Sequence, residues 1–136
     1  MDLLLSINYK YIKQIEKKTK LYEIRKTIYK KEISHIYVHS SGKLNTIVGR
    51  FKPLEVINKS PKTIWEEYSN FLGVTEEEFK VYSGKYEKLY IIKIGFYEKP
   101  LKNIDLKKIF KKYHAPQMYK YLNKKESKLL QRYFNI

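Results

Sequence analysis

Short apolar runs, most of them alternating with polar positions, predict β-strands in five parts of the chain. These runs cover residues 3–7, 20–29, 33–41, 45–57 and 88–97. In the run 45–57, Gly49 marks a bulge or a bend, and Pro53 is compatible only with a sheet edge or an irregularity. The run 3–7 is apolar almost throughout, which is typical of a buried strand.

Helical spacing of apolar residues, together with capping residues, predicts five helices between and after these strands. They cover residues 8–20, 60–73, 75–81, 105–113 and 123–134. Ser60 and Pro61 start the clearest of them, in which Trp65 belongs to the apolar, core-facing stripe. Thr75 and Glu78 have the spacing of a capping box. The predicted caps of the other three helices are Asn8, Asp105 and Asn123.

This mixed order of strands and helices indicates an α+β domain rather than a regular alternation of the two. We expect about five to six strands, mostly antiparallel, in a sheet small enough to curl into a barrel with flanking helices. A chain of 136 residues fits one domain over residues 1–136, with residues 122–136 as a C-terminal helical extension.

The composition favours a polyanionic partner. The chain carries 29 Lys and Arg against 14 Asp and Glu, and the net charge of +15 places nucleic acid ahead of an anionic membrane surface. Its 14 tyrosines offer rings for base stacking, although core packing is the ordinary role of any one of them. The lack of cysteine excludes disulfides, thiolate zinc sites and cysteine nucleophiles. The leucine run at residues 3–5 is too short for a signal peptide or a membrane span, so we expect a cytoplasmic protein with no membrane partner.

Three charged side chains within residues 17–26 are the main candidates for a binding site: Lys20, Glu23 and Arg25. On a strand Glu23 and Arg25 share a face, and Lys20 joins them only if the chain still turns before the strand begins. The two cations would then bind an anion while Glu23 holds them in place. The alternative is a salt-bridged strand surface with no binding role.

The same run resembles the G-x-K-x-x-E-x-R signature of the ASCH family, whose members are β-barrels related to the RNA-binding PUA domains. Lys20, Glu23 and Arg25 match this signature in type and spacing, and Lys18 stands where the signature has glycine. The resemblance extends over residues 2–122 and includes the run 113–122, which resembles the proline-glutamine-aromatic tail of one ASCH branch.

The resemblance implies RNA binding, or a role in RNA metabolism, in a cleft beside the signature strand. Some ASCH members are ribonucleases, and a Lys/Glu/Arg cluster is suited to polarise a phosphate and to move a proton from a 2′-hydroxyl. Another ASCH subfamily is an amidohydrolase acting on acetylated cytidine, with a nucleophilic threonine two residues before the signature arginine. Glu23 occupies that position here, and a carboxylate cannot repeat the addition chemistry of a threonine.

Two further polar groups are candidates for nucleic-acid contacts. Ser40 and Ser41 lie at a predicted strand end, where they form either a phosphate-binding nest or an ordinary turn. Gln117 and Tyr119 supply an amide and a ring that either flank a flipped base or seal the open end of the barrel.

Lysines of the predicted helix at residues 105–113 form a basic stripe opposite its apolar face. Lys107, Lys111 and Lys112 on this stripe would follow a phosphate backbone without reading its sequence. A solvated helix face with no partner is the alternative reading.

The three histidines predict no metal site. His35 and His39 share a strand face but lie about 13 Å apart along it, so they are expected to be surface or rim residues. His114 lies in a non-helical turn and is the histidine most suited to act as an acid or a base. We expect no metal and no cofactor.

These patterns lead to one main hypothesis: a module that binds RNA, or another nucleic acid, with a base or nucleotide over Lys20, Glu23 and Arg25. Gln117 and Tyr119 would form the opposite wall of the cleft. One alternative is a metal-independent ribonuclease in which Lys20 and Glu23 are catalytic. The other is a small regulator or inhibitor that acts through a protein partner.

Overall fold

The structure is a computed structural model that describes residues 1–42, 44–116 and 118–134. Its larger sheet has four strands in the order β4-β3-β1-β7. Their bounds are Asp2–Asn8 for β1, His35–Ser41 for β3, Ile47–Phe51 for β4 and Lys120–Leu122 for β7. β1 pairs in parallel with β3, and the other two pairings are antiparallel.

The smaller sheet is antiparallel, with three strands in the order β2-β6-β5. Its strands are β2 (Tyr22–Arg25), β6 (Leu89–Ile94) and β5 (Pro53–Lys59). The predicted α+β class with mostly antiparallel strands is confirmed. Strand pairing within the described residues gives two separate sheets, so the closed barrel expected from the sequence is not shown.

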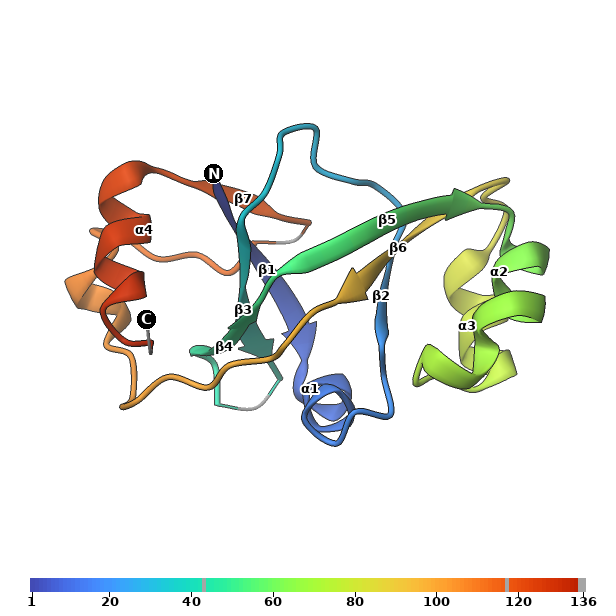
Figure 1. Cartoon of the computed structure of the whole chain (residues 1–136), viewed down its shortest axis with the longest axis horizontal. Coiled ribbons are helices and arrows are strands. Elements are labelled where there is room, and N and C mark those ends of the chain that lie inside the picture. The colour runs from blue at the N-terminus through green and yellow to red at the C-terminus, as the bar shows by residue number, and fades with distance from the viewer. Residues whose placement is uncertain (43, 117, 135–136) are drawn as a thin grey trace.

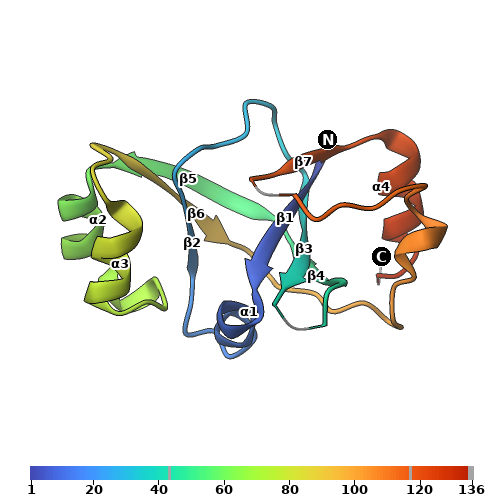
Figure 2. The same ribbon diagram turned by 180° about the vertical axis from the view of Figure 1, so that it is seen from behind.

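Four α-helices flank the two sheets in the described part of the chain. They are α1 (Tyr9–Glu16), α2 (Pro61–Tyr68), α3 (Glu76–Ser83) and α4 (Lys124–Gln131). The predicted N-caps are confirmed, because the side chains of Asn8, Ser60, Thr75 and Asn123 each accept a backbone N–H of the helix that they precede. Figure 1 shows α2 and α3 together at one end of the molecule and α4 at the other end, and Figure 2 shows the same from behind.

Buried apolar side chains form three clusters that follow this arrangement. One cluster contains Leu3, Leu5 and Ile92, and therefore joins β1 of the larger sheet to β6 of the smaller one. On the other side of β1, Leu4 belongs to a cluster under α4, and a third cluster packs α2 and α3 against the smaller sheet. The C-terminal segment with α4 thus packs into the core through Leu130 and Phe134.

Two predicted elements differ from the observed ones, and one observed strand was not predicted. The single strand expected over residues 45–57 is two strands, β4 and β5, which belong to different sheets. A β-bulge does lie beside Gly49, and Pro53 does begin an edge strand. The helix expected over 105–113 is only a short 3₁₀ turn, Leu106–Lys108, and the strand β7 was not foreseen. Among the described residues no helix is both long enough and apolar enough to cross a membrane.

Candidate nucleic-acid site

The end of α1 determines where the candidate site begins. Lys18 follows the helix with a positive φ of 62°, the left-handed conformation. Its N–H donates to Ile15 O at 3.1 Å, and the next N–H, that of Thr19, donates to Gln14 O at 3.0 Å. These two hydrogen bonds define a Schellman motif, which reverses the chain after the helix. The turn brings Lys20 inward just before β2, as the sequence hypothesis required.

Lys20 is one of the most buried charged residues, with 3% of its surface exposed. Its Nζ donates to Leu72 O at 2.7 Å and lies 3.6 Å from Glu23 Oε1. Burial lowers the pKa of Lys20, and the negative charge of Glu23 partly opposes this shift. The contacts with Leu72 O and Glu23 hold the buried amine in a fixed position.

Glu23 and Arg25 extend from the same face of β2, next to Lys20. Arg25 Nη2 donates to Ser6 O of β1 at 2.8 Å, and Arg25 Nε lies 3.1 Å from Glu23 Oε2. The Nε–H does not point at an acceptor among the described residues, so this contact is an ion pair without a hydrogen bond. Glu23 thus lies between two cations, and the group of three keeps one net positive charge.

A cavity of about 170 Å³ opens over these three side chains. Its walls come from the end of β1, from Tyr11 of α1, and from Phe79 and Tyr82 of α3. A protein cavity of roughly 150 Å³ holds one benzene ring, so this one has room for a single six-membered ring or a phosphate group. The cavity therefore has charged side chains at its floor and aromatic rings in its walls.

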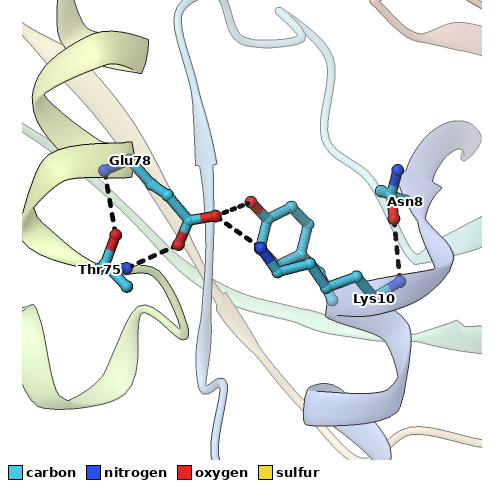
Figure 3. Close-up of polar contacts among 5 residues, drawn as sticks. Asn8, Lys10, Thr75 and Glu78 are labelled. Atoms are coloured by element: carbon cyan, nitrogen blue, oxygen red, sulfur yellow. Dashed lines mark hydrogen bonds and ion pairs between the residues drawn. The ribbon is translucent and has the colours of Figure 1, made fainter.

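An ion pair joins α1 to α3 beside this cavity. Lys10 Nζ lies 2.6 Å from Glu78 Oε2, and the hydroxyl of Tyr11 donates to the same oxygen at 3.4 Å (Figure 3). Glu78 also accepts the N–H of Thr75 at 2.9 Å in the predicted capping box. These contacts lower the pKa of Glu78 to about 2, the hydrogen bond from Lys10 being the largest cause. Glu78 is therefore a fixed carboxylate at the cavity rim.

The fold was compared with solved structures and the sequence with known proteins. The chain superposes on the ASCH protein of Zymomonas mobilis with a TM-score of 0.89 and 20% identity, over 98% of this chain and 96% of that one. This chain has the ASCH fold. A tyrosine-to-phenylalanine variant and a serine-to-alanine variant of the Zymomonas protein each give a TM-score of 0.88 at 20% identity, over 98% of this chain and 99% and 96% of theirs. No protein-family model and no curated protein matches the sequence.

The ASCH fold explains the glycine of the signature that residues 17–26 resemble. That glycine corresponds to Lys18, whose backbone is left-handed, a conformation that glycine adopts without cost. The same turn forms here although a lysine stands in place of the glycine. The resemblance drawn from Lys20, Glu23 and Arg25 is thus confirmed at the level of the fold, and the structure brings the three side chains together.

Other predicted contact residues do not reach this cavity. Ser40 is fully buried in β3 and its N–H donates to Thr46 O, so its backbone is not an open phosphate nest. Ser41, at the end of β3, is paired with Asn8 of the neighbouring strand β1. Tyr119 lines a neighbouring cavity instead, and the wall opposite β2 comes from α3. Gln117 lies outside the described residues.

The predicted lysine stripe lies on a different part of the molecule. Lys107, Lys111 and Lys112 are exposed, but they lie in a 3₁₀ turn and in bends, and they do not share one face of a helix. Ile109 and Phe110 between them pack into the cluster under α4, on the opposite side of β1 from the candidate site. They therefore do not extend the cavity.

None of the three histidines lines the cavity. His39, expected at the surface, is 1% exposed, and its ring contacts Ser6 Oγ at 3.2 Å and Asn45 Oδ1 at 3.0 Å. Burial lowers the pKa of both His39 and the partly exposed His35. His114 is exposed and does not line the site. Within the described ranges no cluster of three or more His, Asp or Glu could hold a metal ion.

Sequence reasoning missed the residues of α1 and α3 that shape the cavity, among them Tyr11, Glu78 and Tyr82. Tyr11 and Glu78 were recognised only as helix residues, because nothing in the local pattern shows that α1 and α3 approach each other. Tyr82 lies just beyond the predicted helix end at residue 81. Its hydroxyl donates to Ile24 O of β2 at 3.3 Å, a contact between distant parts of the chain.

Proposed function

We propose that this protein binds single-stranded or locally unpaired nucleic acid, RNA first, and holds one base in the cavity over Lys20, Glu23 and Arg25. RNA comes before DNA because proteins usually recognise RNA through unstacked bases in loops and ends. The ASCH fold and the charge of +15 are compatible with this role.

One observation carries the proposal: the three signature side chains converge beneath a cavity of about 170 Å³ with aromatic walls. Arg25 and Lys20 offer donors, and Glu23 offers carboxylate acceptors. A phosphate has acceptors only, whereas the edge of a base has both donors and acceptors. The mixed floor therefore favours a base, and the limited volume favours a pyrimidine-sized ring.

Binding of a short unpaired RNA, measured by fluorescence anisotropy between about 0.05 and 0.3 M salt, tests this proposal. Arg25→Gln should weaken binding by about 10-fold or more, because it removes the positive charge and the forked guanidinium donors from the cavity floor. Lys111→Gln is the matched control: it removes the same charge on the other side of β1 and should change the affinity much less. Circular dichroism must first show that both variants fold.

An equal effect of the two variants would mean that only the overall charge attracts RNA, and the proposal would be wrong. So would tight binding that is insensitive to Arg25→Gln. Capture of a protein partner that survives nuclease treatment, combined with no affinity for RNA, would favour the alternative role of a regulator acting through a protein.

Ribonuclease activity is a second candidate, favoured by the environment of Lys20. Its lowered pKa increases the fraction of neutral amine that can accept a proton from a 2′-hydroxyl, while Arg25 would stabilise charge on the phosphate. Incubation of end-labelled RNA with the pure protein tests this. Cleavage must disappear in Glu23→Gln and in Lys20→Met variants that fold; cleavage that persists comes from a contaminant.

A further inference from the structure

A second cavity, of about 290 Å³, lies next to the candidate site and is not used by the function proposed above. Arg25 and Tyr82 line both cavities. The two cavities are therefore neighbours, with these two side chains as their common boundary. The second one continues toward Tyr86 of the segment after α3 and toward Tyr119 near β7.

The charge of the second cavity differs from that of the first. Arg25 and Lys26 line it, and no carboxylate is found among its described lining residues. The first cavity has Glu23 and Glu78 on its surface. A phosphate is therefore favoured beside Arg25, on the boundary between the two, with Lys26 next to it in the second cavity.

Aromatic rings form the outer part of the second cavity. Lys26 Nζ lies 4.6 Å from the ring centre of Tyr82 and 5.2 Å from that of Tyr86. The hydrogen bond to Ile24 O fixes the Tyr82 ring, and 49% of the Tyr86 surface is exposed. Exposed rings combined with a cation are the features with which proteins bind successive bases of a single strand.

The geometry points to a binding site for two consecutive nucleotides. One base enters the first cavity, the next stacks on Tyr86 in the second, and the phosphate between them contacts Arg25 and Lys26. The larger volume of the second cavity, about 290 Å³ against about 170 Å³, leaves room for a purine there. This inference rests on the proposed function, because the first base must occupy the cavity over Lys20 and Glu23.

Calorimetric titration with uridine monophosphate and with the dinucleotides UpA and ApU tests the inference on the full chain. The better dinucleotide should bind about 10-fold or more tightly than the mononucleotide, since it adds a stacked base. Lys26→Gln should reduce this dinucleotide affinity by about 10-fold, because the phosphate that joins the two bases contacts Lys26. Tyr86→Ala should act on the dinucleotide alone, because the mononucleotide has no second base to stack on this ring.

Lys102→Gln is the matched control for Lys26→Gln. Lys102 is exposed and its Nζ also lies over a tyrosine ring, 5.5 Å from the centre of Tyr133, but away from both cavities. Lys102→Gln removes the same charge and the same kind of ring contact as Lys26→Gln. It should change neither the mononucleotide affinity nor the dinucleotide affinity.

The outcomes separate this inference from the proposed function. If the mononucleotide binds and the dinucleotides bind no more tightly, the second cavity is not a nucleotide site, although the first one remains. If Lys26→Gln and Lys102→Gln have equal effects, the contacts of Lys26 with the tyrosines serve only the fold. If none of the nucleotides binds, the proposed function and this inference are both wrong.

Discussion

Lys18 has the backbone conformation that an ordinary side chain adopts least readily. Its φ of 62° belongs to the left-handed region, which costs a residue with a Cβ roughly 1–2 kcal/mol. The Schellman motif nevertheless needs this conformation to place Lys20, whose Nζ must reach Leu72 O. The turn therefore stores strain that serves the geometry of the site.

Replacing Lys18 by glycine should stabilise the protein. We expect Lys18→Gly to raise the free energy of unfolding by about 0.5–1 kcal/mol, because the relief of strain exceeds the extra flexibility of glycine in the unfolded chain. Urea denaturation measures the change. Lys17→Gly is the control: Lys17 caps the same helix with a right-handed φ of −80°, so glycine there should lower the free energy instead. A loss of stability in Lys18→Gly would contradict the account of the turn.

Among the contacts between secondary-structure elements, the contact of α1 with α3 closes one side of the candidate cavity. It depends on Glu78, which belongs to the capping box of α3. The Glu78 carboxylate accepts hydrogen bonds from Lys10 and Tyr11 of α1 (Figure 3). Because the pKa of Glu78 is lowered to about 2 in the folded protein from an ordinary 4.5, ionisation of this carboxylate favours folding. This contribution is complete above about pH 4.5 and is lost as the pH falls toward 2.

Glu78→Gln should therefore remove part of the acid sensitivity of the fold. A glutamine keeps the capping box, so the variant isolates the ionic contact with Lys10. We expect the wild type to be the more stable protein above about pH 4.5, and the difference to shrink as the pH approaches 2. Thermal unfolding at a series of pH values measures it.

Glu77→Gln provides the comparison for this experiment. Glu77 lies in the same first turn of α3, and within the described residues it makes no ion pair or side-chain hydrogen bond. Its replacement removes the same charge from the first turn without removing an ion pair, so it should lower the stability less than Glu78→Gln does at neutral pH. A stability difference for Glu78→Gln that does not change with pH would show that Lys10 and Glu78 are not paired in solution.

Local elements of this fold were predictable from sequence where short-range chemistry decides them. The N-caps and the Thr75–Glu78 capping box were confirmed because both depend on residues a few positions apart. The helix predicted over 105–113 was wrong. Ile104 and Phe110 are both buried in the cluster under α4, and this packing replaces the regular helix with a 3₁₀ turn.

Contacts between distant segments were not predictable. The parallel pairing of β1 with β3, the short strand β7 and the approach of α3 to α1 have no local signal. The convergence of Lys20, Glu23 and Arg25 was predictable because one short run contains all three. The walls of the same cavity were not, since Tyr11 and Tyr82 come from helices about 70 residues apart.

At the scale of the whole molecule, RNA binding has two contributions that need to be distinguished: attraction by the overall charge of +15 and binding in the candidate cavities. The first cavity lies between α1, β2 and α3, and the second continues from β2 toward Tyr86 and Tyr119. The exposed lysines 107, 111 and 112 lie in the segment beside α4, at one end of the molecule in Figure 1. Any polyanion is attracted to so basic a surface, and its binding falls steeply with salt. Crude RNA binding therefore reports the surface as well as the site.

A triple variant, Lys107→Gln with Lys111→Gln and Lys112→Gln, should distinguish the two contributions. For an RNA of about 20 nucleotides, we expect the slope of log affinity against log salt to decrease by up to about 0.7 for each phosphate that no longer binds a lysine. The affinity for uridine monophosphate should stay the same, because a mononucleotide in the cavity lies on the other side of β1 from these lysines. Arg25→Gln should give the reverse pattern, a large loss for the mononucleotide and a small change in slope. If the triple variant weakens mononucleotide binding as much as Arg25→Gln does, the ligand does not bind in the cavity over β2, and the basic surface beside α4 is the better candidate for the binding site.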